Sequence, residues 1–109
     1  MNNIAIIGGS GFIGSYTKKE LVDHGYNVTT IDINKNSDIC CNVLDYKSLK
    51  KALSTKNFDA VYMFAAISDS KENHIDIKHA VNTNIMTLTN TLDAMYELNI
   101  SRIIFSSTV

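Results

Sequence analysis

The chain has 109 residues, of which 45% are hydrophobic and 19% are charged, and its formal net charge is −1. This length and composition are ordinary for a globular protein, so we expect one domain over residues 1–109. The near-neutral charge argues against a nucleic-acid partner, and no apolar run suits a signal peptide or a membrane span. We therefore expect a cytoplasmic protein with no nucleic-acid and no membrane partner.

Apolar runs alternate with helical stretches along the chain, a pattern typical of parallel strands joined by crossover helices. Strands are predicted at residues 3–7, 28–32, 39–43, 60–64 and 102–106. Helices are predicted at residues 12–24, 46–54 and 74–98. Right-handed crossovers then favour an α/β fold with a doubly wound parallel sheet in the strand order 3-2-1-4-5, and a ligand crevice between the first and fourth strands.

The predicted helices have recognisable ends and faces. Gly25 and Asn99 suit the left-handed position that ends a helix, and Asp45 can cap the second helix. Apolar side chains share one side of two helices, namely Ile13, Tyr16, Thr17 and Leu21 in the first, and Ile77, Val81, Ile85, Leu88, Leu92 and Met95 in the third.

Two residue pairs with possible special chemistry have ordinary explanations. Cys40 and Cys41 are adjacent, where a disulfide would be strained, so we expect buried, reduced thiols. His74 and His79 lie five positions apart and so on different faces of the predicted helix, and we expect no metal site.

Residues 8–14 read GGSGFIG between the first predicted strand and the first predicted helix. Such a loop turns sharply, brings bare backbone against a pyrophosphate and starts a helix whose amides face the negative charge. Gly8, Gly11 and Gly14 fit the spacing GxxGxxG, while Gly9, Gly11 and Gly14 fit GxGxxG, so the string leaves both loop geometries open. A tight turn without a ligand also remains open at this point.

Asp32 ends the second predicted strand, eighteen residues after Gly14, close to the spacing of about twenty expected for the acid that binds the adenosine ribose. A carboxylate there repels a 2′-phosphate, and Ile33 and Asn34 offer no arginine to neutralise one. NAD is therefore favoured over NADP. Lys35 keeps NADP open as an alternative.

The glycine loop and Asp32, in this order along the chain, resemble the motifs of the extended short-chain dehydrogenase/reductase superfamily. This superfamily includes the NAD-dependent epimerases and dehydratases, and its cofactor domain is a Rossmann fold. The likeness runs over essentially the whole chain and favours the spacing GxxGxxG. By this resemblance the cofactor contacts of the first half of the chain are Gly8, Gly11, Phe12, Ile13, Gly14, Asp32 and Ile33, together with Asn42 and Val43 at the adenine. Asn42 replaces the family's acid, and its amide oxygen can still accept a hydrogen bond from the adenine amino group.

The second half of the chain resembles the same family at three places. Phe64, Ala65 and Ala66 correspond to the end of the fourth strand, beside the pyrophosphate and the nicotinamide ribose. Asn84 matches an asparagine of the long helix, although Thr87 and Leu88 replace the usual Gly and Thr after it. The resemblance also implies that Ser106 and Ser107 approach the cofactor and that Thr108 is a catalytic residue whose hydroxyl bonds the substrate.

The resemblance implies a nucleotide-sugar epimerase or dehydratase that acts by transient hydride transfer to NAD, in a parent protein that forms a homodimer through the long helix. The family's proton-transfer pair, a tyrosine with a lysine four residues later, follows the fifth strand. We therefore expect this chain to be the N-terminal, NAD-binding part, to lack the pair and the substrate domain, and to be inactive alone. Alternatives are a non-catalytic NAD(P)-sensing or binding module and an NADP-dependent reductase of the same superfamily. A methyltransferase fits less well, because the serines after the fifth strand and Asn84 would have no role in it.

The fifth predicted strand lies at an edge of the sheet and carries the apolar run Ile103, Ile104 and Phe105. Exposed edge strands pair readily with other chains. We therefore expect the chain by itself to self-associate or to be only marginally stable.

Overall fold

The computed structural model describes residues 2–8, 12–64 and 77–106, and for Phe12, residues 77–81 and Ser106 it describes the backbone alone. Five parallel strands form one sheet in the order β3-β2-β1-β4-β5, which confirms the predicted order. The strands are β1 (Asn3–Ile7), β2 (Asn27–Asp32), β3 (Ile39–Cys40), β4 (Ala60–Phe64) and β5 (Ile103–Ser106).

The third strand is shorter than predicted, with two residues instead of five. After Cys41 the chain turns, because the Asn42 side-chain oxygen accepts a hydrogen bond from the Leu44 N–H at 3.0 Å. The Asp45 N–H also donates to the Asn42 carbonyl oxygen at 3.0 Å. An asparagine side chain that bonds the backbone two residues on competes with the strand ladder, so β3 stops where this turn begins.

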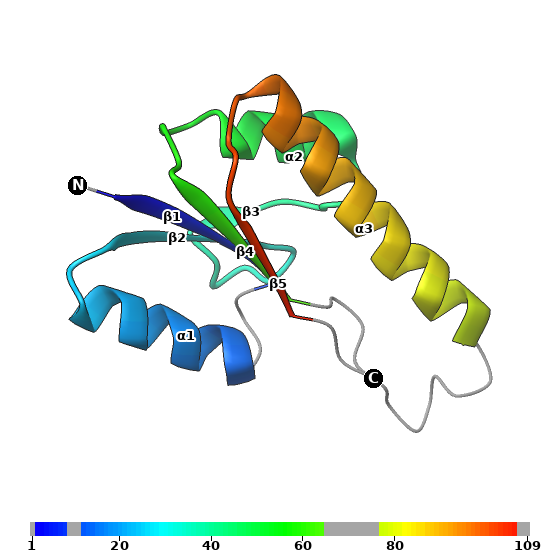
Figure 1. Cartoon of the computed structure of the whole chain (residues 1–109). Helices are drawn as coiled ribbons and strands as arrows, with labels where there is room; N and C mark the ends of the chain where they lie inside the picture. The colour runs from blue at the N-terminus through cyan, green and yellow to red at the C-terminus, as the bar shows by residue number, and fades with distance from the viewer. Residues whose placement is uncertain (1, 9–11, 65–76, 107–109) are drawn as a thin grey trace.

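Within the described residues, three helices cover the sheet: α1 (Phe12–Asp23), α2 (Tyr46–Leu53) and α3 (Ile77–Glu97). Figure 1 shows α1 on one side of the sheet and α2 and α3 on the other. The predicted stops are confirmed, since Gly25 has φ +90° and Asn99 has φ +60°. Asp45 does occupy the N-cap position of α2, but its predicted capping bond is absent, and its carboxylate instead accepts a hydrogen bond from the Ser48 hydroxyl at 2.9 Å.

The two faces of the sheet carry separate apolar cores, as expected for a parallel sheet covered on both sides. Alternate residues of β1 point to opposite faces. Ile4 and Ile6 join the smaller cluster, against which Leu21 of α1 packs. Ala5 and Ile7 join the larger cluster, which also contains residues of α2 and α3, among them Leu49, Leu53, Ala94 and Met95.

The helix faces differ from the apolar periodicity. In α1, Leu21 packs on the core, but Ile13 and Tyr16 are more than half exposed. In α3, Leu88 and Met95 pack on the core as the pattern indicates, whereas Ile85 and Leu92 are exposed. The buried face of α3 contains Thr87 and Thr91 in place of Ile85 and Leu92.

Thr87 and Thr91 are almost fully buried in α3. Their hydroxyls donate to backbone carbonyls one turn earlier, Thr87 to Thr83 at 2.9 Å and Thr91 to Thr87 at 2.8 Å. A threonine with its hydroxyl bonded inside the helix has little polar surface left to desolvate, so it can pack against a sheet. A count of apolar residues does not detect such a face.

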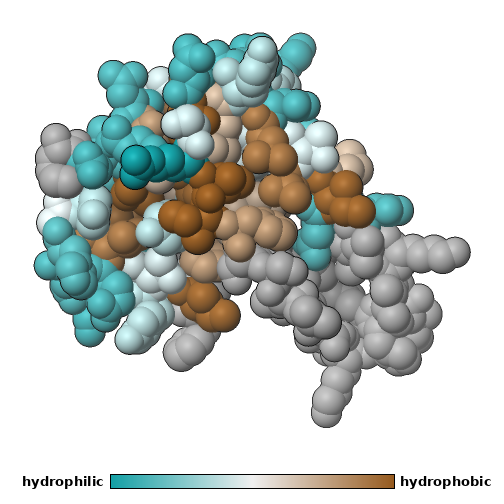
Figure 2. All heavy atoms as spheres, in the orientation of Figure 1, coloured by the Kyte–Doolittle hydropathy of each residue, from teal (hydrophilic) through white to brown (hydrophobic). Residues whose placement is uncertain are grey.

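Apolar side chains are exposed on β5 and α3, where Figure 2 shows brown surface on the side facing the viewer. On β5 they are Ile104 and Phe105, and on α3 they are Ile85, Met86, Leu92 and Tyr96. Among the helices of residues 12–64 and 77–106, none combines the length and apolarity that a bilayer crossing needs.

The two cysteines are both free, as expected, but differ in environment. Cys41 is buried, and its burial raises the pKa of the thiol. Cys40 is exposed, contrary to the expectation that both are buried. The reason is the alternation of side chains at β3, which sends neighbouring residues to opposite sides.

Candidate functional site

The carboxyl ends of four strands meet in one row, and the position at which a crevice is predicted, between β1 and β4, lies in this row. Ile7 pairs with Ile31 on one side and with Met63 on the other. Phe64 pairs with Ser106 on β5. Parallel strands that reverse their order at such a point leave room for a ligand outside their carboxyl ends.

Gly8 follows β1 at this point, and its position requires glycine. Its φ is +80°, and a Cβ placed on it would lie 3.0 Å from the Phe64 carbonyl oxygen. Its N–H donates to the Ile31 carbonyl oxygen at 3.0 Å. Because that donor is already used, Gly8 shapes the loop, and the N–H groups in the first turn of α1 are the described ones that can face an anion.

The first turn of α1 supplies the rest of the described loop. Phe12 begins the helix, Gly14 is buried within it, and Ile13 is 52% exposed. Figure 1 shows this end of α1 beside the carboxyl ends of the strands. The positive end of the helix dipole therefore lies near the predicted pyrophosphate position.

Asp32 is the last residue of β2 and is half-buried. Its Oδ1 accepts a hydrogen bond from the Ile33 N–H at 2.6 Å. Ile33 itself is 69% exposed. The carboxylate therefore lies at the carboxyl end of β2, beside an exposed apolar residue, and its contact with the ribose stays a prediction.

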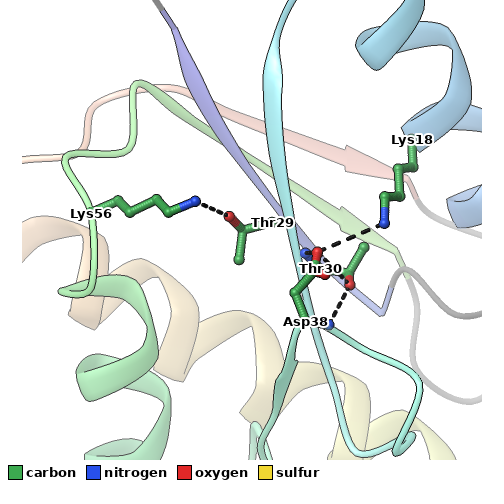
Figure 3. Close-up of polar contacts among 5 residues, drawn as sticks. All are labelled: Lys18, Thr29, Thr30, Asp38 and Lys56. Carbon is green, nitrogen blue, oxygen red and sulfur yellow. Dashed lines mark hydrogen bonds and ion pairs between the residues drawn. The ribbon is translucent and has the colours of Figure 1, made fainter.

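Asp38, which the sequence reasoning missed, fixes the loop that follows Asp32. Its Oδ2 accepts hydrogen bonds from the Thr30 N–H at 2.9 Å and the Thr30 hydroxyl at 3.2 Å. The Asp38 N–H donates back to the Thr30 hydroxyl oxygen at 2.9 Å, and Lys18 of α1 approaches the carboxylate at 3.7 Å (Figure 3). These contacts hold the ends of the loop together and tie it to α1. An acid just before a short strand is the only signal for them in the sequence.

A second lysine holds β2 from the other side. Lys56, in the loop between α2 and β4, donates to the Thr29 hydroxyl at 3.2 Å (Figure 3). Thr29 and Thr30 are both buried, so these bonds satisfy hydroxyls that would otherwise be costly to bury. Together they keep the end of β2, and with it Asp32, in a fixed place.

The hydrogen bond from the Thr30 N–H holds the pKa of Asp38 below its usual range. The ionised carboxylate therefore stabilises the folded chain above the unfolded pKa of about 4, and this contribution is lost as pH falls through the lower folded pKa. We expect Asp38→Asn to lower the free energy of unfolding at neutral pH by about 0.5–1 kcal/mol, since the group is partly exposed. The deficit should shrink below about pH 4, as followed by urea denaturation across pH.

The control is Asp23→Asn, because Asp23 is exposed at the end of α1. A deficit in Asp38→Asn that stays constant down to the acid limit, or one that Asp23→Asn reproduces, would contradict this account of Asp38.

The predicted adenine contacts lie in the turn after β3. Asn42 is exposed, while Val43 is half-buried and packs on the larger core. The bond from Leu44 uses one lone pair of the Asn42 side-chain oxygen, and the second remains for an amino group. This oxygen is therefore oriented by the turn itself.

The remaining predicted residues are placed unequally. Phe64 is half-buried beside Gly8, and Asn84 is half-buried in the first part of α3. Ser106 pairs through its backbone with Phe64. The other predicted residues lie outside the described residues, so their roles stay predictions: Gly11, Ala65, Ala66, Ser107 and Thr108.

The spacing of the family's proton-transfer pair, a tyrosine with a lysine four residues later, occurs once in the sequence, at Tyr46 and Lys50 of α2. Both side chains bond the carboxylate of Glu97, the last residue of α3. Figure 1 shows α2 beside this end of α3, near the start of β5. The string therefore links two helices at the amino end of the sheet, and it lies away from the carboxyl-end row.

A shallow groove lies between α1 and the loop after β2. Its lining includes Lys18 and Lys19 together with Asp23, so its charge is mixed. Among the described residues, none of the predicted cofactor contacts lines this groove. The groove is therefore a neighbour of the candidate site and is separate from the crevice.

The sequence matches the NAD dependent epimerase/dehydratase family over residues 4–109. Among curated proteins, it is 32% identical to the UDP-glucose 4-epimerase of Lacticaseibacillus casei, over 96% of this chain and 35% of that protein. The UDP-glucose 4-epimerase of Yersinia enterocolitica is 30% identical, over 96% of this chain and 36% of that protein. The chain thus spans about a third of the length of the relatives it matches.

Solved structures are similar as well. The UDP-glucose 4-epimerase of Brucella ovis, in complex with NAD, superposes with a TM-score of 0.88 at 28% identity, over 98% of this chain and 36% of that one. The enzyme of Bifidobacterium longum, in complex with NAD+ and UDP, superposes with a TM-score of 0.85 at 25% identity, over 99% of this chain and 37% of that one.

Proposed function

Residues 4–109 belong to the NAD dependent epimerase/dehydratase family, and we propose that this chain is the NAD-binding part of a nucleotide-sugar epimerase. The observation that carries the proposal is the backbone at Gly8. There the chain leaves β1 at a positive φ, against the end of β4 and beside the end of β2. Such a turn directs the chain into α1, whose N-terminal N–H groups would bind a pyrophosphate.

Each end of the dinucleotide has candidate contacts around this turn. Asp32 would accept hydrogen bonds from the adenosine ribose, and its charge would disfavour a 2′-phosphate. Asn42 would accept a bond from the adenine amino group. Phe64, Asn84 and Ser106 would lie towards the nicotinamide, with Ala65, Ala66 and Ser107.

When bound, NAD would accept a hydride from the substrate and return it. The work of the chain is then to bind and orient both molecules, with the Thr108 hydroxyl bonded to the substrate. The substrate we propose is a UDP-hexose, because UDP-glucose 4-epimerases recur among the similar proteins. We expect the chain by itself to be inactive, because a tyrosine and lysine that transfer protons beside the nicotinamide would have to come from outside it. The free thiols of Cys40 and Cys41 fit a reducing cytoplasm.

The decisive assay uses the purified full-length protein with NAD and UDP-glucose or UDP-galactose. We expect interconversion of the two sugars and transient absorbance of reduced nicotinamide. A protein that binds NAD but converts neither sugar would instead support the non-catalytic sensing module. A protein that is active only with NADP would support the reductase alternative, in which the nearby Lys35 could contact the 2′-phosphate.

We also propose that the protein forms a homodimer through α3. Ile85, Leu92 and Tyr96 are exposed, at spacings of seven and four that place them along one side of the helix. An apolar stripe of this kind marks a protein interface.

Sedimentation can separate this interface from the sheet edge at β5. We expect the 109-residue chain to self-associate. The substitution Leu92→Glu should weaken association through α3, and Ile104→Glu should weaken association through β5. Each substitution places a charge where an apolar contact would be desolvated. A chain that sediments as a stable monomer at high concentration would contradict both interfaces.

A further inference from the structure

Two hydrogen bonds between residues of the turn itself hold the turn after β3. Asn42 is the acceptor in both of these bonds, from the Leu44 N–H at its side-chain oxygen and from the Asp45 N–H at its carbonyl oxygen. The carbonyl oxygens of Val43 and Leu44 belong to the same turn and take part in neither of these two bonds. The Val43 carbonyl is partly buried, and leaving such a backbone acceptor without a hydrogen bond is costly.

Asn90, in the middle of α3, supplies both partners. Its Nδ2 donates to the Val43 carbonyl oxygen at 3.2 Å and to the Leu44 carbonyl oxygen at 3.1 Å. A primary amide has two N–H donors, so this one group satisfies both carbonyls. The orientation of the amide is fixed by the contact itself, since two acceptors face the nitrogen.

The helix that carries Asn90 is rigidly seated. Thr91 and Ala94, one and four residues on, are fully buried against the sheet side. At its C-terminal end α3 is also tied to α2 through Glu97, which bonds Lys50 at 3.1 Å. A side chain locked on a packed helix can hold a loop in place more accurately than the loop can hold itself.

From these contacts we infer that Asn90 is a positioning residue that sets the Asn42 amide for recognition of adenine. The inference rests on the proposed NAD function. Asn90 contacts the two residues that directly follow Asn42, and the turn they form orients the Asn42 oxygen through the Leu44 N–H. Loss of the Asn90 bonds frees this turn and therefore the oxygen that would accept from the adenine amino group.

The test compares two dinucleotides in the purified protein: NAD, and nicotinamide hypoxanthine dinucleotide, which carries a carbonyl in place of the adenine amino group. Wild type should bind NAD more tightly. Asn90→Leu, of similar size but without donors, should raise the NAD dissociation constant by about 3- to 10-fold and change that of the hypoxanthine analogue by less than about twofold. The preference for adenine should therefore largely disappear.

Asn90→Ala serves if the leucine variant does not fold. Glu97→Gln is the matched control, because it weakens the link between α2 and α3 without touching the turn, and it should keep the adenine preference. An unchanged preference in both Asn90 variants, or equal losses for the two dinucleotides, would overturn the positioning role. Wild type that binds neither dinucleotide would overturn the proposed NAD function itself.

Discussion

Gly8→Ala should lower the free energy of unfolding by about 2–5 kcal/mol. A residue with a Cβ pays about 1–2 kcal/mol in the left-handed region. At Gly8 the added Cβ would also meet the Phe64 carbonyl oxygen at 3.0 Å, which forces the ends of β1 and β4 apart. Overpacking of that kind adds about 1–3 kcal/mol. Urea denaturation measures the sum.

Gly25 offers a matched control for this prediction. Its φ of +90° resembles that of Gly8, but a Cβ placed on it would meet no atom within 4 Å. Gly25→Ala should therefore cost only the backbone part, about 1–2 kcal/mol. If the two alanine variants are equally stable, the close approach of Gly8 to β4 has no energetic weight, and the argument that this turn requires glycine fails.

Asp32→Ala should weaken NAD binding by about 2–3 kcal/mol, or about 30- to 150-fold, because hydrogen bonds to a charged group are worth about 1.5–3 kcal/mol. Binding of NADP should change much less, since the carboxylate gives it no comparable contact and repels its phosphate. Calorimetry with both dinucleotides measures the ratio.

The control for Asp32 is Asp93→Ala, which removes an exposed carboxylate from α3, far from β2 in the chain. It should leave the ratio of the two affinities unchanged. An unchanged ratio in Asp32→Ala as well would mean that the ribose does not lie at the end of β2.

Much of the fold follows from the sequence because it depends on local patterns. Buried strands are recognised by their runs of apolar residues. The loop after the first strand and the end of the first helix each need glycine, at Gly8 and Gly25. The strand order then follows from the handedness of the crossovers. The carboxyl-end row then places Gly8, Asp32 and Phe64 together without further information.

The contacts of Asp38 and Asn90 could not be predicted in this way. Each joins a side chain to backbone groups of another element, and Asn90 reaches 47 and 46 residues along the chain. Which carbonyls lack partners is known only once the elements have packed. Tyr46 and Lys50 show the opposite case, in which a sequence pattern suggests a role that the packed structure does not support. Their spacing matches a catalytic pair, but both side chains bond Glu97 and so link α2 to α3.

We propose that NAD binds at the carboxyl-end row of β1, β2 and β4. Isothermal titration of the purified protein with NAD, and separately with NADP, tests it most directly. We expect saturable binding of NAD at one site per chain, with clearly weaker binding of NADP. Absence of NAD binding, or tighter binding of NADP than of NAD, would contradict it.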